Sequence, residues 1–192
     1  MKKTIITICA VLGLALAGHA QDAFQQHDKV VNIGVGLFNT RYADGHFVNK
    51  IPPISASFEY CIIDHVFDDK SGIGVGGVFG FTGAEHQIAS AGNARYGWRY
   101  RDYLVAARGA FHYQPVRGMD TYVGFVSGYN ILTSKRFGAD VWPGEVNVEA
   151  DEPYFVFGGI LGIRYYFSDS FGVMAEAGTS LSYLTVGVAL RF

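Results

Sequence analysis

Strict alternation of apolar with small or polar residues is the feature that most limits what this chain can fold into. Eight segments show it, and the last, at residues 182–192, shows it most clearly. Its residues separate into an apolar and a mixed set: Leu184, Val186, Val188, Leu190 and Phe192 against Tyr183, Thr185, Gly187, Ala189 and Arg191. A period of two over this length predicts a β-strand whose two faces meet different surroundings.

The other alternating segments are spaced like the strands of a meander. They span 30–40, 53–63, 72–82, 100–114, 119–130, 153–167 and 171–179. Helical periodicity is absent, and after residue 20 no apolar stretch reaches the 18 residues that suggest a membrane-spanning helix. The links are alternately long (41–52, 83–99, 131–152) and short (64–71, 115–118, 168–170), and the final link, 180–181, is also short. This pattern is typical of an up-and-down barrel with one loop-bearing rim.

Composition indicates which face of such a barrel points outward. Charged residues make up 17% of the chain, below the roughly 25% of ordinary globular domains. The polar face is rich in glycine, and all six lysines fall outside the predicted strands or at their ends. Glycine suits the narrow bore of eight strands, whereas a water-facing sheet normally carries several lysines. We therefore expect an all-β fold: an eight-stranded antiparallel up-and-down transmembrane β-barrel with its apolar face toward lipid.

The predicted inner face carries charges of both signs. We expect a lumen polar network of Glu59, Arg108, Arg164, Glu176 and Arg191. An isolated charge in a dry lumen costs several kcal/mol, so these groups should pair. The same assignment of faces puts Tyr122 and Val126 inside. Because eight strands leave room only for side chains, we expect a filled lumen, with a small gated pore as the alternative.

The first 20 residues read as a secretory signal peptide. Lys2 and Lys3 precede an apolar run at 4–17, and Gly18-His19-Ala20 offers small residues for cleavage before Gln21. Residues 21–192 would then form one barrel domain with 13 basic and 17 acidic side chains, a formal charge of −4. This balance gives no support to nucleic-acid binding. Cys61 would be the one remaining cysteine, so no intrachain disulfide is expected.

Several segments resemble the small OmpA/OmpX-like outer-membrane β-barrel proteins of Gram-negative bacteria. They are FEYCIIDHVFDDKSGIGVGG (58–77), RGAFHY (108–113) and residues 162–192, within a resemblance that covers 24–192. The family's C-terminal insertion signal, polar–x–Gly–x–x–apolar–x–aromatic, is matched by Thr185, Gly187, Leu190 and Phe192. The resemblance implies an outer-membrane location, contact with outer-membrane lipid and lipopolysaccharide, and recognition of the last strand by the barrel-assembly machinery. It identifies a scaffold and no activity.

The long links carry the candidate contact residues. These are His86, Arg95, Trp98 and Arg99 in link 83–99, and Trp142 in link 131–152. Arginine side chains there could meet lipopolysaccharide phosphates, and the acidic second link could hold divalent cations or face a surface or envelope protein partner. Plain solvated loops are the alternative. No cofactor is expected, and no His/Cys/Asp cluster has metal-ligand spacing.

Catalysis has little support in the sequence. Residues 72–77 satisfy GxGxxG, but the next residues, VFGFTG, remain strand-like, so small residues facing a narrow bore explain the pattern better. Some barrels of this size modify lipid A, and His86, His112, Ser127 and Glu176 are of the residue types required, yet no two form a local motif. The sequence favours a non-enzymatic structural or surface-interaction protein, with a pore or a lipid A-modifying enzyme as alternatives.

Overall fold

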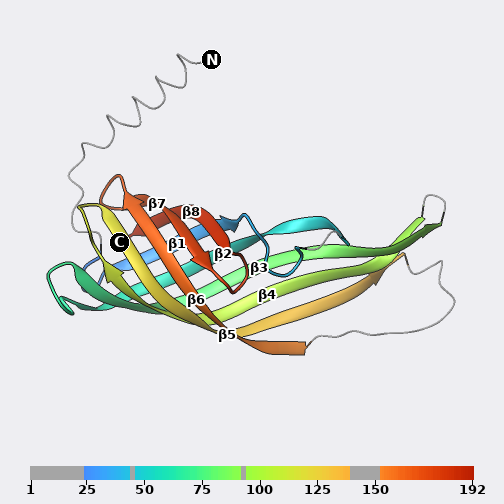
Figure 1. The fold of residues 1–192 in the computed structure, drawn as a ribbon, viewed down its shortest axis with the longest axis horizontal. Coiled ribbons are helices and arrows are strands. Elements are labelled where there is room, and N and C mark those ends of the chain that lie inside the picture. Colours follow the sequence, from blue (N-terminus) through green and yellow to red (C-terminus); the bar gives the residue numbers. More distant parts are fainter. Residues whose placement is uncertain (1–23, 44–45, 92–93, 139–151) are drawn as a thin grey trace, which may run out of the picture.

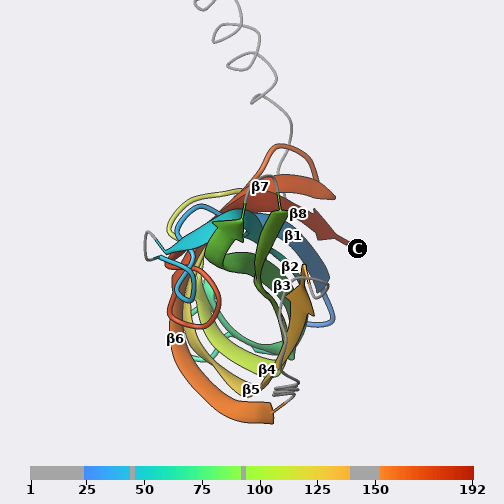
Figure 2. The ribbon, with the colours of Figure 1, turned by 90° about the vertical axis from the view of Figure 1, so that its right-hand side faces the viewer.

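The fold is a closed antiparallel β-barrel. The computed structural model describes residues 24–43, 46–91, 94–138 and 152–192, without the side chains of 88–95 and 152. Each strand pairs with the next and β8 pairs with β1, so the sheet closes into a ring (Figures 1 and 2). The expected eight-stranded up-and-down barrel is confirmed. The strands are β1 (Lys29–Gly36), β2 (Phe47–Asp64), β3 (Ser71–Ala91), β4 (Ala94–Tyr113), β5 (Met119–Phe137), β6 (Glu152–Tyr166), β7 (Phe171–Gly178) and β8 (Leu184–Arg191).

The two faces of the ring are arranged as in a membrane barrel. The outward side chains are apolar and the buried inward ones include charged residues, the reverse of a soluble barrel. Tyr122 and Val126 are both 2% exposed, which confirms the face assignment of β5. Among the described residues, no helix has the length and hydropathy to cross a membrane. The exposed apolar residues include Ile33, Val35, Ile54, Phe58, Phe79, Val105, Val123, Phe125, Tyr129, Phe155, Phe157 and Leu161.

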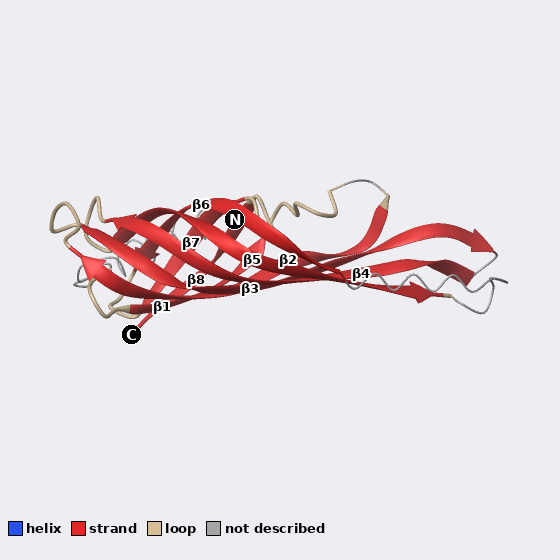
Figure 3. Cartoon of the chain, turned by 90° about the horizontal axis from the view of Figure 1, so that it is seen from below, coloured by secondary structure: helices blue, strands red, loops and turns tan. Residues whose placement is uncertain are grey.

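The strands differ greatly in length. β1, β7 and β8 have 8 residues each, whereas β2 to β5 have 18, 21, 20 and 19. A transmembrane strand needs about 9–11 residues, so the longer strands continue well past the ring. Their outer ends form one four-stranded sheet that extends from one end of the barrel (Figures 1 and 3). We call it the projecting sheet, and it comprises residues 47–51, 83–91, 94–101 and 133–137.

The projecting sheet corrects the prediction that 83–99 is a loop. These residues belong to β3 and β4, which pair from Gly83 with Arg101 as far as Ala91 with Ala94. The apolar alternation ends at this point because the outward face, which is apolar in the ring, here carries charged residues such as Glu85, Arg99 and Lys135. Lys50 and Lys135 likewise lie within strands, but beyond the closed ring.

The opposite rim carries the short turns and the described chain ends. Residues 65–70, 114–118 and 167–170 link β2 to β3, β4 to β5 and β6 to β7. Gly118, at φ 73°, adopts a left-handed conformation that favours glycine, just before β5 begins. The last residue, Phe192, exchanges backbone hydrogen bonds of 3.0 Å with Lys29, which completes the β8–β1 pairing. The barrel is therefore strongly asymmetric from one rim to the other.

Candidate functional site

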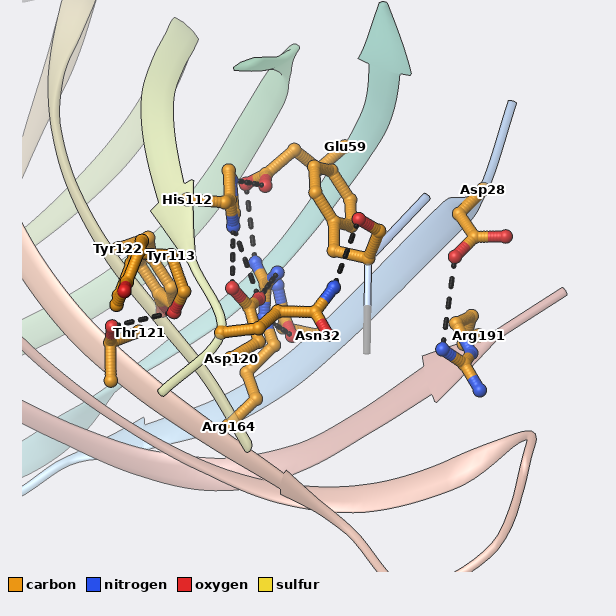
Figure 4. A network of polar contacts seen from close by, with 12 residues as sticks. Asp28, Asn32, Glu59, His112, Tyr113, Asp120, Thr121, Tyr122, Arg164 and Arg191 are labelled. Carbon is orange, nitrogen blue, oxygen red and sulfur yellow. Dashed lines mark hydrogen bonds and ion pairs between the residues drawn. The ribbon is translucent and has the colours of Figure 1, made fainter. Parts of the chain in front are cut away.

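Arg164 of β6 is the centre of a buried polar network in the lumen. Its guanidinium reaches three other strands and is completely buried. Nη1 lies 2.8 Å from Oδ2 of Asp120, Nη2 lies 3.2 Å from Oε2 of Glu59, and Nε donates to Oδ1 of Asn32 at 3.1 Å (Figure 4). One side chain thereby links β6 to β5, β2 and β1 across the bore.

His112 of β4 lies between two carboxylates. Its Nε2 is 2.5 Å from Oε1 of Glu59, and its Nδ1 is 2.9 Å from Oδ1 of Asp120 (Figure 4). Nδ1 is hydrogen-bonded to Asp120, whereas the close contact of Nε2 with Glu59 lacks hydrogen-bond geometry. Two carboxylates this close to one ring favour the imidazolium form. The ring of Phe24 covers His112, with ring centroids 4.0 Å apart. The geometry therefore assigns a positive charge to His112.

Arg108 of β4 extends the network toward the projecting sheet. Its Nε lies 2.9 Å from Oε2 of Glu59, its Nη2 donates to Oε2 of Glu176 at 3.0 Å, and its Nη1 donates to Ser57. The hydroxyl of Tyr122 donates to the same oxygen of Glu176 at 2.7 Å. The charges of the network then balance, with three acids (Glu59, Asp120, Glu176) and three cations (Arg108, His112, Arg164). Balanced pairing of this kind is what allows ions to remain in a dry lumen.

A glycine makes room for the network at its most crowded point. A Cβ on Gly162 would lie 2.2 Å from Cζ of Tyr122, so a larger residue would displace the ring. The Tyr122 ring in turn lies 4.4 Å from the guanidinium carbon of Arg164. Gly162 therefore leaves room for the ring of Tyr122, its direct cross-strand neighbour on β5.

Four of the five residues predicted for the lumen network lie in it: Glu59, Arg108, Arg164 and Glu176. Arg191 does not. It lies at the rim, where Nε donates to the carbonyl of Asp169 and Nη1 is 3.7 Å from Asp28 (Figure 4). Sequence reasoning missed Asp120 because it directly follows a turn and resembles a turn residue. Its inward parity, shared with Tyr122, was the signal that could have identified it.

Side chains fill the lumen above the network as well. Leu181, from the link between β7 and β8, folds inward and packs in a cluster with Leu104 and Ile160. Below it lies a cavity of about 30 Å³, room for about two water molecules. At the mouth, the hydroxyl of Tyr42 donates to Asp102, and burial together with this bond raises the pKa of Tyr42 well above its ordinary value. This filling gives no support to a standing pore.

The residue types considered for lipid A chemistry are not assembled into one site. Ser127 of β5 lies on the outward-facing side between Phe125 and Tyr129, which are both half exposed. His112 is buried inside, and His86 lies on the projecting sheet. A nucleophile needs its base within hydrogen-bond reach, and Ser127 and His112 are on opposite faces of the barrel wall.

The inner face of the projecting sheet is aromatic. The Phe47 ring centroid lies 5.0 Å from that of Tyr42, 5.8 Å from that of His86 and 6.1 Å from that of Tyr100. Trp98 lies opposite His86 in the register. Two of the predicted loop contacts, His86 and Trp98, therefore belong to this strand surface.

The remaining predicted contacts are distributed differently. Arg99 lies on the outward face of the projecting sheet, where its Nη2 is 2.6 Å from Oε1 of Glu85. The side chain of Arg95 and all of Trp142 lie outside the described residues, as do the signal segment and most of the acidic link. Arg99 thus lies on the other face of the projecting sheet from His86 and Trp98.

The residues of the predicted assembly signal lie on β8 and just beyond it. Leu190 is 38% exposed and Phe192 is 68% exposed, both toward the lipid side. Gly187 lies opposite Gly34 of β1, and a Cβ there would come within 2.0 Å of the carbonyl oxygen of Ile33. Thr185 lies opposite Gly36. The part that Thr185, Gly187, Leu190 and Phe192 play in assembly remains a prediction.

Comparison with known proteins finds similarity to solved structures, among them membrane barrels. No protein family model matches the chain, and no curated protein matches it. A de novo designed transmembrane β-barrel is 14% identical, with 90% of this chain and 99% of that chain covered and a TM-score of 0.47. Ail, the attachment invasion locus protein of Yersinia pestis, is 11% identical, with 87% of this chain and 96% of that chain covered and a TM-score of 0.45. The N-terminal β-barrel domain of OprF of Pseudomonas aeruginosa is 12% identical, with 87% of this chain and 98% of that chain covered and a TM-score of 0.45. Identities this low say nothing about what this chain binds.

Proposed function

We propose that this protein is an integral protein of a Gram-negative outer membrane that holds a contact surface for a partner outside the membrane. The closed ring is the anchor, and the projecting sheet is the contact surface. The observation that carries the proposal is the length of β3 and β4, 21 and 20 residues, about twice what a bilayer requires. Outer-membrane barrels keep short turns on the periplasmic side, so the sheet would stand at the cell surface.

The lumen supports the anchoring role. A network of paired charges, closed by Phe24 on one side and Leu181 on the other, links the strands of the ring across the bore, and the cavity beside Leu181 is only about 30 Å³. A gated pore is the alternative, and conductance in a planar bilayer distinguishes the two. The proposal expects no steady current from the purified protein, whereas regular single-channel steps would favour the pore.

Surface display tests the location and orientation. We would insert one epitope tag between Ala91 and Ala94 at the far end of the projecting sheet, and a matched tag after Val116 in the opposite turn. On intact cells an antibody should bind the first tag, and it should reach the second only after the outer membrane is permeabilised. Staining of the second tag alone on intact cells would reverse the orientation and contradict the proposal.

Photo-crosslinking tests the contact role. A photoreactive amino acid would replace Trp98 on the aromatic inner face, and a control would replace Phe157, which is 68% exposed on the lipid side. The proposal expects one discrete protein adduct from the first position in intact cells and none from the control. Identical adducts from both positions, or none from position 98, would contradict a contact role for the sheet.

A further inference from the structure

Three cations lie close together on the outward face of β4 and β5. They stand where the projecting sheet, seen in Figure 1, leaves the barrel. Arg99 lies opposite Lys135, and Arg101 lies opposite Thr133. Directly opposed side chains on one face have Cβ atoms about 5 Å apart. With Tyr103, these residues line a hollow of about 350 Å³. We call these five residues the basic hollow.

The charge of the basic hollow is only partly balanced by described acidic residues. Arg99 pairs with Glu85, whose other oxygen accepts from Asn49. Within residues 24–43, 46–91, 94–138 and 152–192, no ion pair to an acid is found for Arg101 or Lys135. Like charges close together on neighbouring strands repel one another. A bound anion would remove this repulsion.

The basic hollow adjoins the lipid-facing surface. On the same face as Arg101 and Thr133, the next pair toward the barrel is Tyr103 with Ile131, and the pair after it is Val105 with Tyr129. Val105 and Tyr129 are 54% and 55% exposed, as expected for side chains that face lipid. Tyrosines concentrate at the level of lipid headgroups. A ligand in the hollow would therefore meet cations at one end and continuous apolar surface at the other.

We propose that the basic hollow binds the phosphate of an anionic membrane lipid headgroup, with Arg101 and Lys135 as its principal ligands and Arg99 as the third. A guanidinium binds phosphate through two parallel N–H bonds, and lysine acts as a compact point charge. A lipid is the occupant because its acyl chains can lie along Val105 and Tyr129 without leaving the membrane. The inference rests on the membrane-embedded barrel of the proposed function and not on partner contact by the inner face of the sheet.

The test measures binding of a fluorescent phosphatidic acid to the full, folded barrel in dodecyl maltoside micelles by anisotropy. The double variant R101Q/K135Q removes the two cations that have no acidic partner among the described residues, and it keeps the Arg99–Glu85 pair. We expect it to weaken binding roughly five- to 25-fold, because a cation at an anionic lipid surface contributes about 1 kcal/mol, or about fivefold. The exchange variant R101K/K135R should keep most of the affinity.

A matched control makes the same change of charge at the other rim. K70Q/R117Q removes two exposed cations from the short turns, and it should bind the probe as wild type does. Heat-dependent gel mobility of every variant confirms that the barrel is closed, so a folding defect is recognised separately. The anisotropy of the lipid probe does not depend on whether position 98 crosslinks to a partner. Failure of the lipid site can therefore be told apart from failure of the proposed contact surface.

Three results would overturn the inference. Equal weakening in R101Q/K135Q and K70Q/R117Q would show a response to net charge only. Unlabelled phosphatidylcholine that competes as well as phosphatidic acid would show that the anionic headgroup is not recognised. Inorganic phosphate that displaces the probe at the same concentration as unlabelled phosphatidic acid would assign the hollow to free phosphate instead of lipid.

Discussion

The lumen and the projecting sheet use the same strands and similar residues, but they place charge in opposite surroundings. β4 supplies Arg108 to the lumen and Arg99 and Arg101 to the sheet. Arg108 is buried against Glu59 and Glu176, whereas Arg101 and Lys135 are exposed and lack a described acidic partner. One strand, β4, thus has its charged side chain paired with carboxylates where it is buried inside the ring, and has a charged side chain exposed to solvent on the projecting sheet.

Removing the central lumen cation should have the largest effect. Arg164→Met leaves Glu59 and Asp120 without their shared guanidinium, and breaking a buried ion pair in this way costs about 3–5 kcal/mol. Urea unfolding of the barrel in lipid vesicles measures the free energy of unfolding. Arg101→Met on the projecting sheet is the matched change and should cost less than about 1 kcal/mol.

A second variant checks the reason for the Arg164 effect. Without Arg164 the network holds three carboxylates and two cations, so adding Asp120→Asn to Arg164→Met restores the charge balance and should recover part of the lost stability. Equal losses from Arg164→Met and Arg101→Met would erase the contrast between the lumen and the sheet.

Glycine substitutions compare the inside of the barrel wall with its outside on a single strand. Gly162→Ala drives a methyl group into the Tyr122 ring, whereas a Cβ on Gly159 has no atom within 4 Å. Overpacking of this kind costs about 1–3 kcal/mol, and Gly159→Ala should stay within about 0.5 kcal/mol of wild type. Urea unfolding measures the free energy of unfolding of both variants. A larger loss of stability from Gly159→Ala than from Gly162→Ala would contradict the packing described for the lumen.

The exposed ion pair of the projecting sheet should contribute little. The side chain of Arg99 is 48% exposed while paired with Glu85, and pairs of this kind are worth about 0–1 kcal/mol. Glu85→Gln should therefore change the free energy of unfolding by less than about 1 kcal/mol. Glu176→Gln, which removes the charge that Arg108 meets in the lumen, should cost more. The reverse order would show that the sheet, rather than the lumen, stabilises the fold.

The smallest effect concerns the pair formed by Asp64, the last residue of β2, and His65, the first residue of the turn that follows. The hydrogen bond to Asp64, followed by the charge of the same residue, raises the pKa of His65 above its ordinary value. Since the charged imidazole is favoured in the folded state, its contribution is complete below the ordinary pKa and is lost as pH rises through the raised pKa. Asp64→Asn should lower the pKa of His65, as followed by NMR titration, and Asp68→Asn should lower it less. Equal shifts in both variants would point to general turn charge instead of the Asp64 contact.

The sequence predicted the ring but not how far its strands extend. Alternation identified all eight strands and the inward parity of Glu59, Arg108 and Arg164, because each face of a membrane strand meets a uniform medium. It failed at 83–99, because the outward face there carries charged residues such as Glu85 and Arg99 instead of the apolar residues that mark the strands of the ring. The basic hollow was missed for the same reason. Lys135 appeared to lie in a loop, and only the β4–β5 register brings it opposite Arg99.

By itself, the sequence determined that this protein is a membrane β-barrel with a polar interior. Period-two patterning decides which side chains face lipid, since a one-residue slip would reverse every face. The tertiary structure alone decided which charges meet. Asp120, His112, Glu59 and Arg164 come from four strands, and barrel closure and stagger, which no local pattern encodes, bring them within hydrogen-bond distance. The same closure sets Arg191 apart at the rim, where it meets Asp28 instead.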